Sequence, residues 1–206
     1  MDEPERAAEQ PPSDSAFVAW AQARAVPLSI PRHDDNYNDL SFIAEVIGGK
    51  RIIAVGESAH YLREWNRWRA RLFKYLALEH GFTTFVLEAG LVEGRRVHDY
   101  VGGADDEWDD IAPCINNVWG VWTEMNELIR WMREWNANPD RPRELRFYSM
   151  DGTGNWGQAR FAYRAVHDFT RKADQGLADD IAWDFETAVE EITLQTRTEI
   201  SPEKFR

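Results

Sequence analysis

Three apolar runs of this chain are each followed by a carboxylate, and a histidine stands three residues after the first carboxylate. The runs and their acids are residues 51–55 with Glu57, residues 83–87 with Glu88, and residues 145–150 with Asp151. The E-x-x-H spacing from Glu57 to His60 places both side chains on one side of a helical turn, where they can hydrogen-bond or share a ligand. Imidazole is a natural general base near neutral pH, and a neighbouring carboxylate fixes its tautomer. The alternative is that Glu57 caps a helix and His60 lies on the surface.

The elements around these acids predict how the side chains are positioned. Each run has the length and residue types of a strand, and a helical pattern follows each of them. We therefore expect an α/β fold in which parallel strands alternate with helices. The carboxyl ends of parallel strands lie along one edge of the sheet, where ligands bind. The sequence thus predicts that Glu57, His60, Glu88 and Asp151 meet in one site.

Helices are predicted where apolar residues recur at helical spacing and where capping residues mark the ends. Their ranges are 15–24, 39–47, 61–80, 92–100, 119–136 and two further stretches after the third strand, the last at 181–198. Gly48-Gly49 and Gly81 stand where the second and third helices should stop. Residues 1–14 are polar and contain prolines, so we expect a disordered tail there and a single α/β domain over 15–206.

The last residues of the sequence carry a helix-start pattern. Ser201, Pro202 and Glu203 are typical of the N-cap and first turn of a helix, yet the sequence stops at Arg206. This pattern predicts that the α/β domain is incomplete at its C-terminus. The alternative is a frayed tail after the helix at 181–198.

The composition disfavours several classes of partner. The chain has 206 residues, 43% of them hydrophobic, and its 24 basic and 36 acidic side chains give a net charge of −12. Such a charge disfavours nucleic acid and anionic membranes. The start lacks a secretory signal pattern, and no stretch has the roughly 20 apolar residues of a membrane span. With Cys114 as its single cysteine, the chain has no internal disulfide, and we expect it to be cytoplasmic.

Several motifs, in their order along the chain, resemble the erythromycin esterase family. They are Val55-Gly56-Glu57-Ser58-Ala59-His60, Arg67-Trp68-Arg69-Ala70-Arg71-Leu72, residues 81–90, the positions Trp119 and Glu124, and residues 147–151. The resemblance implies an erythromycin-esterase-like fold and hydrolysis of the lactone ester of macrolide antibiotics, with a small molecule as the substrate. It implies that His60 is the general base that activates water, and that Glu57, Arg69 and Glu88 have active-site roles.

The family site also uses a histidine from the C-terminal half of the domain. None of the remaining histidines of this chain (His33, His80, His98 and His167) stands in that context. Two hypotheses follow. The chain is a hydrolase that cleaves an ester or lactone, or it is a truncated, catalytically inactive remnant that binds small molecules.

The residue chemistry agrees with ester hydrolysis by water. The oxyanion that forms during the attack needs a positive partner, and Arg69 is the candidate. Arg67 and Arg71 are expected to form a solvated face paired with Glu64 at helical spacing. No G-x-S-x-G motif is present, so Ser58 is not predicted to be a nucleophile.

Two other patterns leave alternatives open. Residues 152–157 match G-x-G-x-x-G, which favours nucleotide binding elsewhere, but here the glycines more readily let the chain turn closely past the site. Glu57, His60 and Glu88 could hold a divalent ion, although a catalytic zinc usually takes more histidines or cysteines. We expect no metal and no cofactor.

Aromatic and acidic residues near the predicted element ends are candidates for holding the substrate. Trp119 and Trp156 lie near such ends, and Asp151 lies at the end of the third strand. Large amphipathic rings commonly wall a cavity or an interface. We therefore assign Trp119, Asp151 and Trp156 to substrate binding.

Overall fold

The chain forms two units, residues 1–46 and 47–206, and each is described by itself. The computed structural model describes residues 14–28, 36–57, 59, 62–115, 122–152 and 159–181. The first unit holds α1 (Asp14–Arg24) and the 3₁₀ helix η1 (Asn38–Leu40), and α2 (Ile43–Ile47) begins in it. The helix predicted over 39–47 is therefore wrong in one respect, because a turn at residues 41–42 interrupts it. The predicted tail lies outside the described residues except for Asp14, and the single domain over 15–206 stays a prediction.

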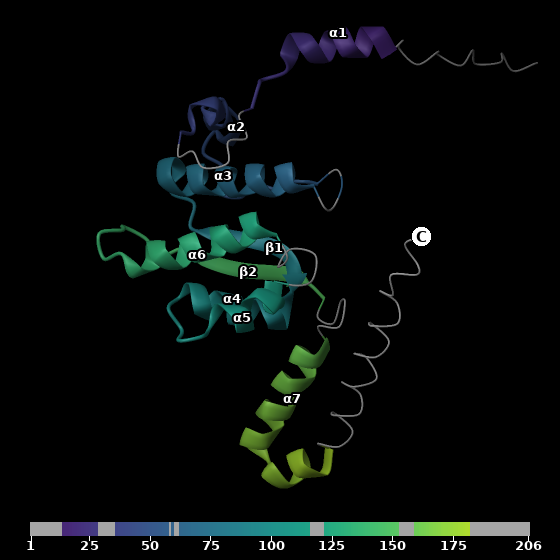
Figure 1. Cartoon of the computed structure of the whole chain (residues 1–206), viewed down its shortest axis with the longest axis vertical. Coiled ribbons are helices and arrows are strands. Elements are labelled where there is room, and N and C mark those ends of the chain that lie inside the picture. The colour runs from purple at the N-terminus through teal and green to yellow at the C-terminus, as the bar shows by residue number, and fades with distance from the viewer. Residues whose placement is uncertain are drawn as a thin grey trace, which may run out of the picture. The chain divides into compact units, whose positions relative to one another are not determined.

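Helices alternate with strands in the second unit (Figure 1). The elements are α3 (Arg63–His80), β1 (Thr84–Gly90), α4 (Leu91–Val101), α5 (Trp108–Ile111), the 3₁₀ helix η2 (Ala112–Ile115), α6 (Thr123–Ala137), β2 (Arg146–Asp151) and α7 (Ala159–Ala173). Residues 175–181 are also helical. The helix predicted at 181–198 lies outside the described residues apart from its first residue. Among the described residues, no helix combines the length and the apolar character that crossing a membrane requires.

The strands β1 and β2 are parallel neighbours, as the sequence predicts. Phe85 pairs with Phe147 and Leu87 with Ser149, and the register then shifts so that Gly90 pairs with Asp151. Two residues of β1 therefore face one residue of β2, which is a β-bulge. Burial alternates along both strands. One face of the sheet is thus covered by the protein, while the other is exposed.

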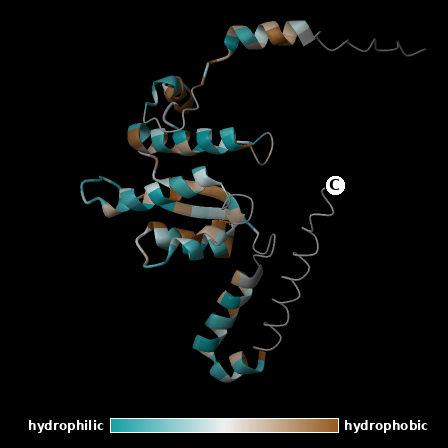
Figure 2. Ribbon diagram, viewed as in Figure 1, coloured by the Kyte–Doolittle hydropathy of each residue, from teal (hydrophilic) through white to brown (hydrophobic). Residues whose placement is uncertain are grey.

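The covered face carries the hydrophobic core of the second unit. Side chains of β1 and β2 join side chains of α3, α4 and α6 in one cluster, which includes Phe73, Phe85, Val97, Leu128 and Phe147. The rings of Phe73 and Phe85 lie 5.1 Å apart between centroids. Figure 2 shows hydrophilic and hydrophobic residues mixed along α3 and α4, as amphipathic helices require. Burying these apolar faces is what holds the helices on the sheet.

The prediction of a strand at residues 51–55 is wrong. None of these residues is in a strand, and the side chain of Ile52 is 86% exposed. A strand needs a hydrogen-bonded neighbour, and in the described part of the chain β1 and β2 pair only with each other. The apolar residues of this run therefore do not form a third strand.

Helix α3 ends where its glycine allows the chain to turn. Gly81 has φ 70°, in the left-handed region that glycine adopts without strain. The backbone N–H of Gly81 and that of Phe82 both donate to the carbonyl oxygen of Leu76. The side chain of Arg143 donates to the carbonyl oxygen of Gly81 at 3.2 Å. The predicted stop of this helix is confirmed, and β1 begins three residues later.

Helix α4 lies close against β2 at one glycine. A Cβ on Gly94 would lie 2.6 Å from the Cβ of Ser149, which is far inside van der Waals contact. His98, one turn further along α4, contributes Nδ1 to a hydrogen bond with the carbonyl oxygen of Phe147 at 2.9 Å. Gly94 and His98 therefore fix the distance between this helix and the strand.

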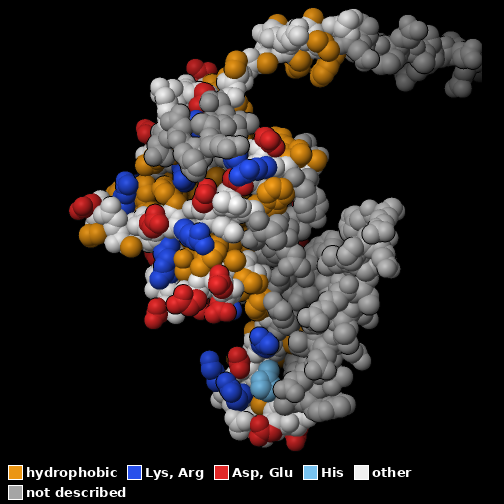
Figure 3. Space-filling view, viewed as in Figure 1, with side chains coloured by type: hydrophobic (Ala, Val, Ile, Leu, Met, Phe, Trp, Pro, Cys, Tyr) orange, Lys and Arg blue, Asp and Glu red, His pale blue; other side chains and the backbone are white. Residues whose placement is uncertain are grey.

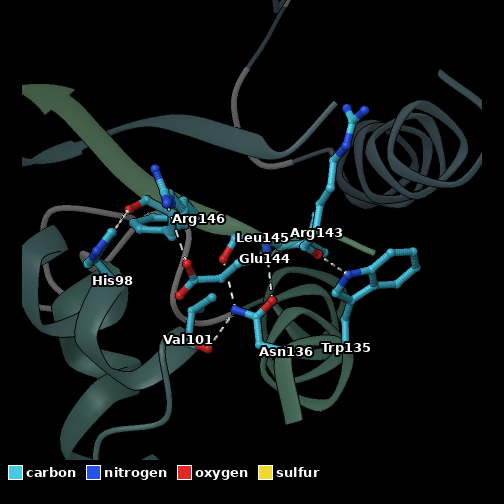
Figure 4. A network of polar contacts seen from close by, with 9 residues as sticks. His98, Val101, Trp135, Asn136, Arg143, Glu144, Leu145 and Arg146 are labelled. Carbon is cyan, nitrogen blue, oxygen red and sulfur yellow. Dashed lines mark hydrogen bonds and ion pairs between the residues drawn. The ribbon is translucent and has the colours of Figure 1, made fainter. Parts of the chain in front are cut away.

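Asn136 connects three backbone segments at the start of β2 (Figure 4). Its Nδ2 donates to the carbonyl oxygens of Val101 at 2.9 Å and Leu145 at 2.8 Å. Its Oδ1 accepts the N–H of Leu145 at 2.7 Å. The neighbouring Trp135 donates through Nε1 to the carbonyl oxygen of Arg143 at 2.8 Å. These bonds tie the end of α6 to the start of β2 and to the end of α4.

Candidate active site

Two of the predicted acids lie at the carboxyl ends of adjacent parallel strands. Glu88 falls in the bulge of β1, and Asp151 is the last residue of β2. The Oδ1 of Asp151 accepts the N–H of Gly152 at 2.7 Å. Bulges re-aim side chains at the ends of strands and are frequent beside active sites. The edge of the sheet on which the sequence places the site is therefore formed by β1 and β2.

Arg69 of α3 lies next to the third predicted acid. Its Nη2 is 3.6 Å from Glu57 Oε1, and the two side chains are only 10% and 13% exposed. Its Nη1 donates to Oδ1 of Asn66 at 3.0 Å, and Asn66 is 1% exposed. The structure thus brings Glu57 and Arg69 together in a nearly buried ion pair.

The electrostatics of Arg69 place Glu88 in the same group of charges. Burial lowers the pKa of the Arg69 guanidinium from its usual value, and the negative charges of Glu57 and, more weakly, Glu88 oppose that effect. An arginine whose pKa is lowered still remains charged at neutral pH. Arg69 therefore presents a fixed positive charge to two of the predicted site acids.

A second ionic cluster lies between α3 and α6. Oε1 of Glu124 accepts hydrogen bonds from Nε of Arg63 and from Nε of Arg67, the latter at 3.0 Å. Burial would raise the pKa of Glu124, but the bonds from Arg63, from the backbone and from Arg67 outweigh it and lower the pKa below its usual value. The carboxylate of Glu124 is therefore ionised at neutral pH.

The prediction of a solvated face for Arg67 and Arg71 is wrong. The side chain of Arg67 is 15% exposed and binds Glu124 of another helix instead of Glu64. Arg71 is 7% exposed. Both arginines are therefore shielded from solvent, and the α3 position of Arg67 faces α6.

Comparison with known proteins decides the family. The sequence model of the family described as erythromycin esterase matches residues 77–201, which is more than half of the chain. The chain belongs to the erythromycin esterase family. It is 29% identical over 159 residues to the erythromycin esterase type II of Escherichia coli, an alignment that covers 77% of this chain and 37% of that protein.

Solved structures agree with the fold of this erythromycin esterase family member. A succinoglycan biosynthesis protein superposes with a TM-score of 0.64 at 22% identity, covering 93% of this chain and 47% of the other. A mutant of the erythromycin esterase EreC in its open conformation gives a TM-score of 0.50 at 22% identity, covering 71% and 35%. The chain thus spans less than half the length of each of these relatives.

Some of the predicted site residues of this family member lie outside the described residues. They are His60, Trp119 and Trp156, together with Ser58. The described ones are Glu57, Arg69, Glu88 and Asp151, and the structure pairs the first two directly. A group of three or more histidines, cysteines or acids that could hold a metal does not occur in the described part of the chain.

Three buried polar residues near this site were not singled out from the sequence for their roles. Asn66 binds Arg69 three residues further along the same helix, a spacing that the sequence shows, whereas Glu124 binds Arg67 from another helix, which no local spacing indicates. Glu93 is 0% exposed, and its carboxylate occupies the space that a Cβ of Gly90 would need. The sequence feature that could have pointed to Glu93 is its position in the first turn of α4, where an acidic residue is favoured.

The surface of the second unit carries charges of both signs. Figure 3 shows Lys and Arg side chains interspersed with Asp and Glu side chains on the visible face of this unit, with apolar side chains between them. Arg95 and Asp99 of α4 form one exposed ion pair of this unit, at 3.0 Å. Such exposed pairs add little to stability.

Proposed function

We propose that this chain is a hydrolase of the erythromycin esterase type, which cleaves an ester or lactone by water attack with His60 as general base. The observation that carries the proposal is the nearly buried pair of Arg69 and Glu57, with Glu88 as a further charge partner of Arg69. A fixed cation beside the carboxyl edge of a parallel sheet is suited to a reaction in which negative charge develops on an oxygen.

In the proposed reaction, His60 takes a proton from a water molecule as that water attacks the carbonyl carbon. The tetrahedral intermediate carries a negative charge on the former carbonyl oxygen, and the guanidinium of Arg69 stabilises it. The intermediate then collapses, the bond from carbon to the alcohol oxygen breaks, and the imidazolium of His60 returns its proton to the leaving alkoxide. The products are one carboxylic acid and one alcohol, or a single hydroxy acid if the substrate is a lactone.

The acids have distinct roles in this proposal. Glu57 binds Arg69 and thereby holds the guanidinium in one orientation. Glu88 adds a second negative charge, so that Arg69 offsets repulsion between the acids. Asp151 and the tryptophans Trp119 and Trp156 are proposed to contact the substrate. A macrolide lactone is the first substrate to test, because the Escherichia coli relative is named an erythromycin esterase.

The test is a direct search for turnover by the purified chain. A panel of macrolides and simple aryl esters is incubated with the chain, and mass spectrometry measures products that have gained one water. The same panel is run with a chelator. Turnover of at least one ester or lactone that persists with the chelator supports the proposal.

Two other results would change the account. Binding of a macrolide, measured by tryptophan fluorescence, without any turnover of the panel would contradict the hydrolase and favour a binding module. Turnover that disappears with the chelator and returns with a divalent ion would replace the metal-free mechanism with a metal-assisted one.

A further inference from the structure

We propose that Glu124 is a positioning residue, which fixes the first turns of α3 and through them the orientation of Arg69. The part of this inference that concerns catalysis rests on the proposed function. The part that concerns the position of α3 rests only on the contacts between α3 and α6.

The carboxylate of Glu124 is nearly buried and binds two arginines. Its side chain is 7% exposed, and Oε1 accepts from both Arg63 and Arg67. The side chains of these arginines are 50% and 15% exposed. The other oxygen, Oε2, is buried and has no hydrogen-bond partner among the described residues. Among the described residues, the groups that bind this carboxylate are the two arginines of α3 and the backbone of Glu124 itself, and the pair with Arg67 is the better shielded of the two ion pairs.

The two arginines lie at the start of α3, one turn apart. The residue before the helix, Leu62, provides no side-chain hydrogen bond as a cap. The first turn of a helix without such a cap is prone to fray. Glu124 holds this first turn in place from another helix, because its carboxylate binds the first residue of α3 and the residue one turn later.

Arg69 follows Arg67 by two residues and points to a different side of α3. It binds Asn66 on its own helix and Glu57 in the segment that precedes the helix. Contacts on two sides of the same two turns restrict the rotation of the helix about its axis. Loss of the Glu124 contact would therefore allow the guanidinium of Arg69 to move relative to Glu57.

The test replaces Glu124 with glutamine, which keeps the shape and one acceptor oxygen but removes the charge. Hydrogen exchange is measured by mass spectrometry on the full chain. We expect amides of residues 62–72 to exchange roughly tenfold faster in Glu124→Gln, while amides of β1 and β2 change less than about twofold. Glu127→Gln, an exposed position on the same helix, is the matched control and should match the wild type.

A second variant keeps the test decisive if Glu124→Gln folds poorly. Arg67→Lys keeps a positive charge but loses the Nε donor, and it should produce the same local increase in exchange to a smaller extent. Unchanged exchange over residues 62–72 in Glu124→Gln, or an equal increase in all elements of the unit, would overturn the positioning role.

Kinetics on an ester that the wild type hydrolyses test the catalytic part. Glu124→Gln should lower kcat roughly tenfold with little change in KM, because the substrate contacts remain while Arg69 loses its orientation. A wild-type kcat in this variant would overturn that part. If the wild type hydrolyses nothing, the proposed function fails, and the exchange experiment still decides whether Glu124 positions α3.

Discussion

At the scale of single residues, Arg69 is the side chain on which the proposed chemistry depends. It brings a positive charge to a position that is nearly closed to solvent, and it is held there by Glu57 and Asn66. A planar guanidinium can bind both partners at once and still present donors to a third group. A lysine at this position would carry the same charge but could not reproduce these contacts.

Arg69→Lys is therefore expected to lower kcat roughly 10- to 100-fold, because the cation is no longer aligned with the developing oxyanion. Ester hydrolysis measured with the purified variant checks this result. Arg95→Lys is the matched control, since the side chain of Arg95 is 72% exposed on α4, and it should keep the wild-type kcat. A wild-type kcat in Arg69→Lys would remove Arg69 from the mechanism.

Glu124 predicts a dependence of stability on pH. Its pKa is lowered in the folded chain, so it stabilises the fold above the usual carboxyl pKa of about 4.3, and this stabilisation is lost as the pH falls below that value. Thermal unfolding between about pH 7 and pH 3 should therefore show a smaller loss of Tm in Glu124→Gln than in the wild type. If the two proteins lost Tm equally as the pH falls, the ionised carboxylate of Glu124 would not stabilise the fold. The control Glu127→Gln should follow the wild type.

The sequence proposed candidate residues for this site but did not predict the partners of the arginines on α3. The family resemblance implied a site role for Arg69, and Arg67 was expected on a solvated face of the same helix, because spacing alone could not say which arginines would be buried. Arg67 was expected beside Glu64 on its own helix and binds Glu124 on another helix instead. Such a contact depends on how α3 and α6 pack, which a local pattern does not contain.

At the scale of elements, β1 and β2 were predictable because each is a short run rich in apolar and aromatic residues, even at exposed positions such as Val86 and Met150. The exposed positions alternate with Phe85, Leu87 and Phe147, which lie in the core. Residues 51–55 have a similar composition and do not form a strand. Residues 51–55 differ from β1 and β2 in lacking a paired strand in the described part of the chain. An apolar run forms a strand only where a neighbouring strand can hydrogen-bond to its backbone N–H and C=O groups.

The packing of α4 on β2 gives a prediction at this scale. In Gly94→Ala, the new Cβ would collide with Ser149, so α4 must move away from the strand. We expect a loss of roughly 1–3 kcal/mol in the free energy of unfolding, measured by denaturant titration. The double variant Gly94→Ala with Ser149→Gly should regain part of this loss, because the colliding side chain is gone.

Gly176→Ala is the matched control for this substitution. Gly176 lies in the helical residues 175–181, and its nearest contact for a new Cβ is Asp174 Oδ1 at an ordinary 3.5 Å. Alanine should leave the stability unchanged or raise it by up to about 1 kcal/mol. A Gly94→Ala variant as stable as the wild type would show that α4 does not depend on this close approach.

At the scale of the whole molecule, the family was recognisable from the order of a few motifs. The stretch from Gly81 to Gly90 and the end of β2 around Asp151 are part of that resemblance, and the family match at residues 77–201 includes both. The parallel α/β arrangement followed from the same residues. Neither the substrate nor the role of His60 follows from the fold, because both depend on a few side chains placed on it.

The most direct test that His60 is the general base is to remove its imidazole and then to restore the activity with imidazole from solution. His60→Ala should lower the rate of ester hydrolysis by about 10²-fold or more, and added imidazole should restore part of the rate in proportion to its unprotonated form. His167→Ala, which changes a histidine on α7, should keep the wild-type rate. A wild-type rate in His60→Ala without imidazole would show that His60 is not the general base.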